Sequence, residues 1–96
     1  MIQTGESTDV VHHRLVIMNE RGLHARAAAK FVGVLNEFDA DVEVEKDGTT
    51  VSGRSIMGLM MLAAAQGTAI LVSAQGIDAQ GAVDALTTLV ENRFDE

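Results

Sequence analysis

Hydrophobic and polar positions in the first half of the chain follow two periods, one typical of strands and one of helices. Residues 13–18, which contain an apolar block at 15–18, predict a strand. Residues 25–37 are rich in alanine and place apolar side chains three and four positions apart, which predicts a helix with His24 at its N-terminal edge. Residues 40–45 alternate valine with acidic side chains, and a Lys-Asp-Gly turn leads to 49–52, so this stretch predicts a hairpin with one solvent-exposed face.

The second half of the chain shows the same change between helical and extended patterns. Ser55 precedes a short apolar segment at 56–62 and is suited to be its N-cap, so we expect a short helix there. Residues 69–74 predict a buried strand, and the apolar stripe of 79–92 predicts the last helix. The resulting order, βαββαβα, needs crossover connections whose helices lie on the sheet. We therefore expect an α+β open-faced β-sandwich, in which a four-stranded, mostly antiparallel sheet carries three helices on one face.

Composition narrows the classes of function. The chain has 96 residues, with no cysteine, no proline and 14 acidic against 7 basic side chains, a formal net charge of -7. This length fits one domain, residues 12–96, after a flexible polar leader of residues 1–11. The acidic charge disfavours nucleic acid and anionic lipid as partners, and the lack of cysteine excludes disulfides and thiolate chemistry. Because no secretory signal and no membrane-spanning apolar run is found, we expect a cytoplasmic protein.

Three histidines are candidates for chemistry. His12 and His13 are adjacent, so in a strand their side chains point to opposite faces, and without a suitable ligand set we expect no metal site. His24 instead stands between a glycine-containing loop and a helix start, where free backbone N–H groups favour an anion. If its imidazole carried a phosphoryl group, those N–H groups and Arg26 could bind the phosphoryl oxygens. The alternative is a solvent-exposed or capping histidine without a function.

Two other features each allow two interpretations. Near two loops that we expect at one end of the sheet, four basic residues form either a positive patch or scattered solubilising charges: Arg21, Arg26, Lys30 and Arg54. The methionine-rich segment after Ser55 is either core or an exposed apolar patch beside a modifiable hydroxyl. For the segment as a whole we favour the core, because methionines at helical spacing are more often buried, and we expect some of its side chains to face solvent on so short a helix. No P-loop, dinucleotide fingerprint or nucleophile elbow occurs, so we expect no cofactor.

Two segments at a fixed separation, GLHARAAAKFV at 22–32 and SIMGLMML at 55–62, closely resemble the HPr family. These are the histidine-containing phosphocarrier proteins of the bacterial phosphoenolpyruvate-dependent phosphotransferase system. The resemblance extends over nearly the whole chain after residue 12 and implies a phosphocarrier, not a stand-alone enzyme, that needs no metal. The family usually has a proline where this chain has Ala27, so we expect a slightly softer helix start without loss of transfer. The resemblance leaves open whether the chain serves sugar uptake or the nitrogen-related branch.

The resemblance also implies roles for individual residues. His24 would accept a phosphoryl group on Nδ1 from enzyme I and pass it to a histidine of a IIA-type protein, with Arg26 as the active-site arginine. Ser55 matches a serine that HPr kinase/phosphorylase modifies in many members. The apolar docking surface of the family corresponds to Ile56, Met57 and Met60. As further partner-binding residues we expect Arg21, Ala27, Lys30 and Arg54.

Two rival functions remain at this point. A regulatory adaptor of the phosphotransferase system, non-catalytic and switched only by phosphorylation of Ser55, would bind proteins through 56–62; the pairing of His24 with Arg26 argues against it. A small hydrolase or metal-binding module that uses His24 is disfavoured because a ligand cluster is missing. Since a carrier must move between partners, we expect a monomer.

Overall fold

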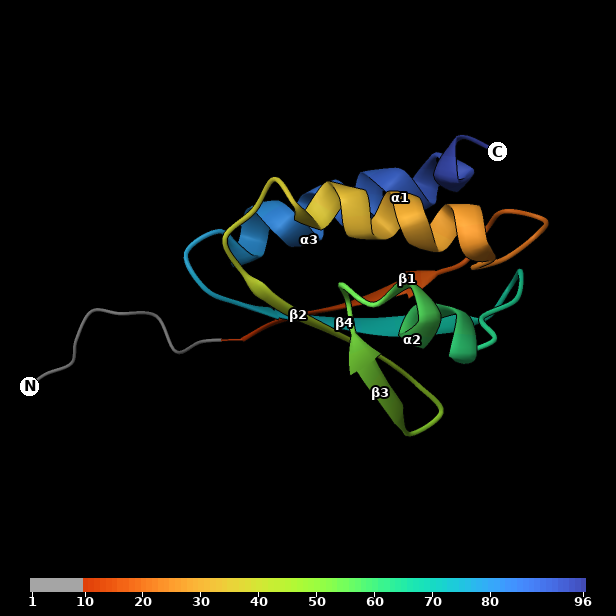
Figure 1. The fold of residues 1–96 in the computed structure, drawn as a ribbon, viewed down its shortest axis with the longest axis horizontal. Helices are drawn as coiled ribbons and strands as arrows, with labels where there is room; N and C mark the ends of the chain where they lie inside the picture. The colour runs from red at the N-terminus through yellow and green to blue at the C-terminus, as the bar shows by residue number, and fades with distance from the viewer. Residues whose placement is uncertain (1–9) are drawn as a thin grey trace, which may run out of the picture.

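Four strands and three helices alternate along the described part of the chain, residues 10–96 of a computed structural model (Figure 1). Of the predicted leader, residues 1–11, only Val10 and Val11 belong to this part, and the rest lies outside the described residues. The observed order confirms the predicted βαββαβα, and a short 3₁₀ turn follows the last helix. The elements are β1 (Val11–Val16), α1 (Ala25–Leu35), β2 (Asp41–Lys46), β3 (Thr49–Ser52), α2 (Ile56–Met61), β4 (Ala69–Gln75), α3 (Ala79–Glu91) and η1 (Arg93–Asp95).

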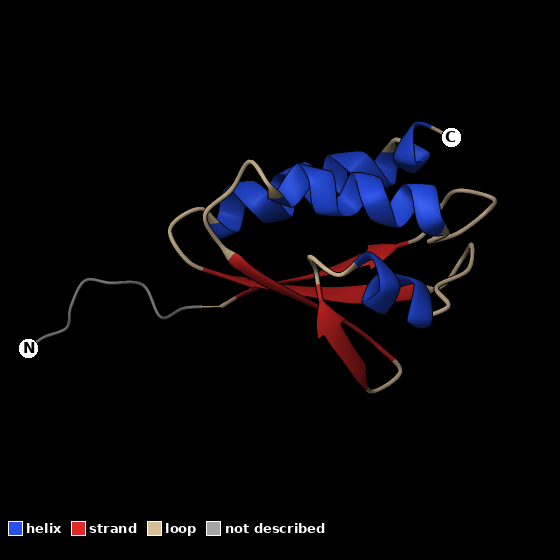
Figure 2. Cartoon of the chain, viewed as in Figure 1, coloured by secondary structure: helices blue, strands red, loops and turns tan. Residues whose placement is uncertain are grey.

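The strands form one sheet in the order β1-β4-β2-β3, and every neighbouring pair is antiparallel. Figure 2 shows α1 and α3 layered over one face of this sheet, while α2 contacts both α1 and β3. The predicted α+β open-faced sandwich is therefore confirmed. β1 begins at Val11, two residues before the expected His13, because Val11 continues the pairing with β4 opposite Ala74.

The inner face of the sheet and the apolar faces of the helices share one core. The strands contribute alternate residues such as Val44 and Val72, because side chains along a strand point to opposite faces. α1 contributes Phe31 and Leu35, and α3 contributes Leu86; all five side chains are fully buried. Burying each such side chain is worth about 1.5–3 kcal/mol. This packing fixes α1 on the sheet and so determines where the helix begins.

Two loops brace each other at the start of α1. The backbone N–H of Leu23 donates to the carbonyl of Ala64, in the loop after α2, at 2.9 Å. Gly22 has a φ of +69°, and a Cβ at this position would lie 2.6 Å from the same Ala64 oxygen. Both the left-handed backbone and the missing space require glycine here. The loop before α1 is thus held by backbone contacts to the loop before β4.

The chain reverses direction after α3 and returns to the start of α1. Arg93, Phe94 and Asp95 have φ angles of 56°, 54° and 58°, a left-handed run that L-amino acids rarely adopt. The reversal buries the Phe94 ring, which is 2% exposed. Lys30 of α1 donates from Nζ to the Phe94 carbonyl at 3.0 Å. These contacts bring the last residue, Glu96, beside the loop that precedes α1.

Candidate functional site

His24 is the N-cap residue of α1. Its φ of -77° and ψ of -179° are extended, and its carbonyl accepts the N–H of Ala28 at 2.8 Å, as the first helical bond requires. The imidazole makes no capping hydrogen bond, so it does not occupy the N–H groups of the first turn. The side chain is 21% exposed. The predicted position of His24 at the helix edge is confirmed, with a ring that can be reached from solvent beside open N–H groups.

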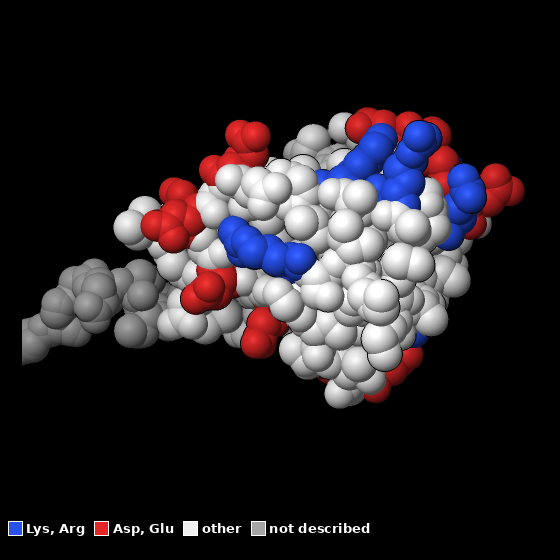
Figure 3. All heavy atoms as spheres, in the orientation of Figure 1, with Lys and Arg blue, Asp and Glu red and all other residues white. Residues whose placement is uncertain are grey.

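Basic side chains surround a recess of about 190 Å³ at His24, and acidic ones share it. Arg26 has no hydrogen-bond or ion-pair partner within residues 10–96, whereas Lys30 lies 3.7 Å from the Asp95 carboxylate. Figure 3 shows this end of the molecule as a gathering of basic side chains edged by acidic ones. The residues that line the recess are Arg21, His24, Arg26, Lys30, Phe94, Asp95 and Glu96.

The carboxylate of Glu96 is the charged group in contact with the imidazole. Its Oε2 lies 3.5 Å from His24 Nε2 and accepts a 3.4 Å hydrogen bond from Asn19 Nδ2, while Oε1 accepts the N–H of Arg21 at 3.4 Å. Partial burial raises the pKa of the Glu96 carboxyl, but these hydrogen bonds, one from the Glu20 backbone and the nearby His24 together lower it below its ordinary value. Glu96 is therefore ionised beside the ring at neutral pH.

Two of the expected partner-binding residues are placed elsewhere. Ala27 has no exposed surface, because it belongs to the buried core at the first turn of α1, so the expectation that its side chain contacts a partner is wrong. Arg54 does not join the basic group around His24, since its guanidinium is bound at the opposite end of the 11-residue helix, about 16 Å away. There it donates to the carbonyl oxygens of Leu35, Phe38 and Ala40.

Ser55 is the N-cap of α2, as expected. Its Oγ accepts the N–H of Gly58 at 2.9 Å. The preferred interpretation of the methionines as core is wrong, because Met57 is 71% and Met61 74% exposed, while Leu59 of the same helix is fully buried. A six-residue helix rests on the core through one side and leaves the others in solvent. We call its outward face the α2 apolar patch: Ile56, Met57, Met60 and Met61.

The segment that directly follows α2 and its apolar patch lies beside His24. A second recess of about 220 Å³ connects the loop before α1 to the end of α2, and the alanines at 63–65 form its floor with Leu23. Figure 3 shows a wide uncharged surface next to the basic end of the molecule. The helix start and the patch can thus be covered by one partner at the same time.

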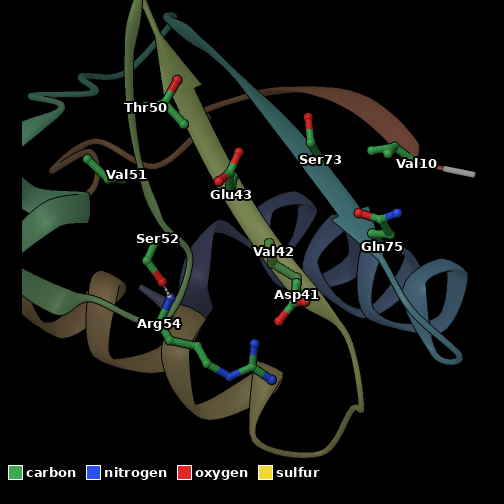
Figure 4. A pocket seen from close by; sticks show the side chains of 10 residues that line it. All are labelled: Val10, Asp41, Val42, Glu43, Thr50, Val51, Ser52, Arg54, Ser73 and Gln75. Carbon is green, nitrogen blue, oxygen red and sulfur yellow. Dashed lines mark hydrogen bonds between the residues drawn. The ribbon is translucent and has the colours of Figure 1, made fainter. Parts of the chain in front are cut away.

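Two other hollows lie along the sheet, away from this chemistry. One of about 540 Å³ lies against β2, β3 and β4, and the side chains of Asp41, Glu43 and Ser73 line it with Arg54 (Figure 4). His12 Nδ1 lies 3.0 Å from the Ser73 hydroxyl. Within residues 10–96 no three His, Asp or Glu side chains come together as a metal site would require. No helix in the same range is long and apolar enough to cross a membrane.

Sequence reasoning missed two residues of the site, Asn19 and Glu96. Asn19 is fully buried, and its Nδ2 donates to the Gly22 carbonyl at 2.7 Å as well as to Glu96. Nothing in the hydrophobic period marks a polar loop residue as buried, and Glu96 lies 72 positions from His24 in the chain. Only the left-handed reversal after α3 brings it back, and no local signal predicts that turn.

Comparison with known proteins agrees with this geometry. The family model described as the PTS HPr component phosphorylation site matches residues 11–92. The phosphocarrier protein HPr of Xylella fastidiosa (strain 9a5c) is 45% identical over 87 residues, which cover 91% of this chain and 98% of the relative. The phosphocarrier protein NPr of Shewanella violacea is 38% identical over 86 residues, 90% of this chain and 94% of the relative.

The three-dimensional fold is shared as well. The crystal structure of HPr-C-His from Thermoanaerobacter tengcongensis superimposes with a TM-score of 0.85 at 42% identity, covering 90% of this chain and 97% of that one. Sequence and structure agree over almost the same range, and the helix start at His24 lies within it. The chain belongs to the HPr family, the phosphocarrier proteins of the phosphotransferase system.

Proposed function

We propose that His24 accepts a phosphoryl group on Nδ1 from phosphorylated enzyme I and passes it to a histidine of a IIA-type protein. The observation that carries this proposal is the capping position of His24. Its ring makes no hydrogen bond to the helix, so the N–H groups of the first turn stay open beside it. A helix N-terminus attracts negative charge, and a phosphoryl group on this ring would meet it directly.

Arg26 is the second group of the proposed reaction. Phosphoryl transfer needs positioning and charge stabilisation more than covalent help from the protein. Arg26 lines the same recess as His24 without a carboxylate partner in the described part of the chain, so its guanidinium is available to the transferred oxygens. In the transfer, the Nδ1 lone pair bonds to phosphorus while the donor's bond to phosphorus breaks and its electron pair returns to the donor. The reverse exchange hands the group to the acceptor.

The α2 apolar patch is the proposed docking surface for both partners. Its methionines are flexible and polarisable, which suits a surface that must fit more than one protein. Residues 63–65, which follow α2, line the same 220 Å³ recess as His24, so a partner seated on the helix would reach the imidazole. Arg21 and Lys30 at the rim add positive charge for acidic partner surfaces. Enzyme I and the acceptor would use this surface in turn, in the cytoplasm, with the carrier as a monomer.

Phosphorylation of Ser55 is the proposed regulation, with HPr kinase/phosphorylase as its catalyst. The hydroxyl now accepts the Gly58 N–H, and a phosphate would add about -1.5 to -2 charges at the edge of the α2 apolar patch. Apolar docking next to that charge would need its desolvation, which opposes binding. Modification of Ser55 would thus weaken transfer through His24 without touching the histidine.

A relay assay tests the proposal. Enzyme I, phosphoenolpyruvate and a IIA-type protein are mixed with the carrier, and phosphate on the acceptor is counted. His24→Ala should transfer nothing, whereas His13→Ala, a matched change of an exposed histidine on β1, should transfer at the wild-type rate. Transfer through His24→Ala would refute the proposal. The exposed patch also permits the adaptor function. That function would replace the proposed carrier function if wild-type protein bound enzyme I through α2 but never carried phosphate.

A further inference from the structure

The contact between Glu96 and His24 involves the ring nitrogen that the proposed reaction does not use. Oε2 of Glu96 lies 3.5 Å from Nε2, and the proposed acceptor atom is Nδ1. A neutral imidazole carries one proton, so one nitrogen is N–H and the other presents a lone pair. A carboxylate oxygen attracts an N–H and repels a lone pair. Its position therefore bears on which nitrogen can act as the nucleophile.

Two donors hold this carboxylate in place. Asn19 Nδ2 binds Oε2, the oxygen that faces the ring, and the backbone N–H of Arg21 binds Oε1. Asn19 has its amide nitrogen between two acceptors, the Gly22 carbonyl and Glu96, which fixes the orientation of the amide. Its Oδ1 is buried and has no partner within residues 10–96. A buried amide with one unpaired atom costs free energy, and here its paired atom positions Glu96.

The backbone after α3 also helps to place the Glu96 carboxylate beside His24. Three consecutive left-handed residues, 93–95, cost conformational energy that an ordinary helix end would avoid. Their effect is to bury Phe94 and to let Lys30 hold its carbonyl, so that the next residue but one reaches the imidazole. Phe94 also joins the hydrophobic core, and Asn19 also donates to the Gly22 carbonyl. The strained turn and the buried asparagine share one result, a fixed carboxylate beside Nε2.

We propose that Glu96 is a positioning residue that keeps the proton of His24 on Nε2 and so leaves the lone pair on Nδ1 for phosphoryl transfer. The inference rests on the proposed function of His24. When Nδ1 bonds to phosphorus and the donor's bond to phosphorus breaks, the ring becomes a cation that still carries its Nε2 proton. The carboxylate then faces that positive charge and stabilises it, as the acid of a catalytic triad does for its imidazole.

Nitrogen-15 NMR of the ring tests the claim without any transfer. In the neutral imidazole of wild-type protein, the shifts of the two nitrogens should report mainly the Nε2–H form. Glu96→Gln keeps the size of the side chain and removes the charge, so the ratio of Nε2–H to Nδ1–H should fall by about fivefold, the effect of one charge at this distance near water. Glu91→Gln makes the same change at an exposed residue of α3 that does not line the recess, and it should leave the ratio unchanged.

The kinetic counterpart is the rate at which phosphorylated enzyme I charges each variant. Glu96→Gln should slow charging by a similar factor, about fivefold, and Glu91→Gln should not. An unchanged nitrogen spectrum in Glu96→Gln would overturn the inference, whatever the rate. If the spectrum shifts as expected but wild-type protein accepts no phosphate, the tautomer assignment stands and the proposed function of His24 fails, so the two failures are distinguishable.

Discussion

Two helices of this protein begin within 32 residues of each other in the chain, and they begin in opposite ways. α2 is capped by Ser55, whose hydroxyl accepts the Gly58 N–H at 2.9 Å. α1 begins at His24, whose ring makes no bond to its helix. A side-chain cap satisfies an N–H group that would otherwise need another acceptor. The start of α2 is therefore closed by its own residue, and the start of α1 is open to an acceptor from outside.

The protein tolerates an uncapped start at α1 because the two helices are stabilised differently. α1 has 11 residues and buries Phe31 and Leu35 in the core, so packing outweighs the missing cap. α2 has six residues and buries Leu59 alone, so its cap is a larger share of its stability. An open helix start is tolerated where the rest of the helix is well packed. That is where the protein places the histidine.

Replacing His24 by serine should have the largest effect, because it removes the difference between the two helix starts. His24→Ser gives α1 the kind of cap that α2 has, so it should abolish phosphoryl acceptance and raise the free energy of unfolding by about 0.5–1 kcal/mol. His24→Ala, which offers no cap, should abolish acceptance without the gain. Urea unfolding and phosphate incorporation measure the two effects. Loss of stability in the serine variant relative to the alanine variant would contradict this view of α1.

Substitution of Gly22, where the two loops contact each other, should have the next largest effect, on the stability of the fold. Gly22→Ala puts a Cβ 2.6 Å from the Ala64 oxygen on a left-handed backbone, so we expect a loss of about 2–4 kcal/mol in unfolding free energy. Gly48 is a matched control: its φ is +86° with no atom within 4 Å of the added Cβ. Gly48→Ala should cost about 1–2 kcal/mol, from the backbone alone. Equal costs for the two variants would show that the loops do not brace each other.

Substitutions of the two arginines that lie near opposite ends of α1 should affect different properties, one the rate of phosphoryl transfer and the other the stability of the fold. Arg26→Gln should slow phosphoryl acceptance by about 10- to 100-fold, because a charge that faces the phosphoryl oxygens is lost, and should leave unfolding unchanged. Arg54→Gln should do the reverse, with a normal rate and about 1 kcal/mol less stability, since three carbonyls lose their donor. Rapid-quench kinetics and urea titrations check both. If Arg54→Gln slowed phosphoryl acceptance, Arg54 would belong to the partner-binding surface after all.

The cap at Ser55 gives a smaller effect. Ser55→Ala leaves the Gly58 N–H without its acceptor and should lower the free energy of unfolding by about 1 kcal/mol. Charging of His24 should continue at close to the wild-type rate, since the hydroxyl is not part of that reaction. Ser55→Asp keeps a capping oxygen and adds charge beside the α2 apolar patch, so it should keep stability and weaken binding to enzyme I. Calorimetric titration against enzyme I distinguishes the two variants.

The smallest expected effect is a pH-dependent contribution of the Glu96 carboxylate to the stability of the fold. The pKa of this carboxyl is lower in the folded protein than its ordinary value of 4.5. A carboxyl with a lowered pKa stabilises the fold above its unfolded pKa, and the contribution is lost as the pH falls through the folded value. Glu96→Gln should thus have a slightly lower urea midpoint than wild type at neutral pH, and the gap should close as the pH falls below the ordinary pKa of 4.5 and through the lowered one. A gap that stays constant with pH would mean that the charge is not involved.

The parts predicted from the sequence are those encoded by local pattern. The period of α1 and the strand alternation around Val44 gave the fold, because a sheet and its helices bury the faces that the pattern marks. His24 was found because a histidine at a helix start is a local feature. The methionine segment of α2 was assigned as a whole to the core, whereas all three methionines of this helix are exposed, because spacing does not show how small a part of a six-residue helix the core covers. Asn19 and Glu96 were missed because their roles depend on contacts between distant parts of the chain.

Intact-mass spectrometry after incubation with phosphoenolpyruvate and enzyme I tests the central claim most directly. The account predicts one added phosphate on wild-type protein, lost after brief mild acid because a phosphorus–nitrogen bond is acid-labile, and none on His24→Ala. Phosphate that survives acid, or that also appears on His24→Ala, would place the modification on another residue and contradict the assignment of the open helix start as the carrier site.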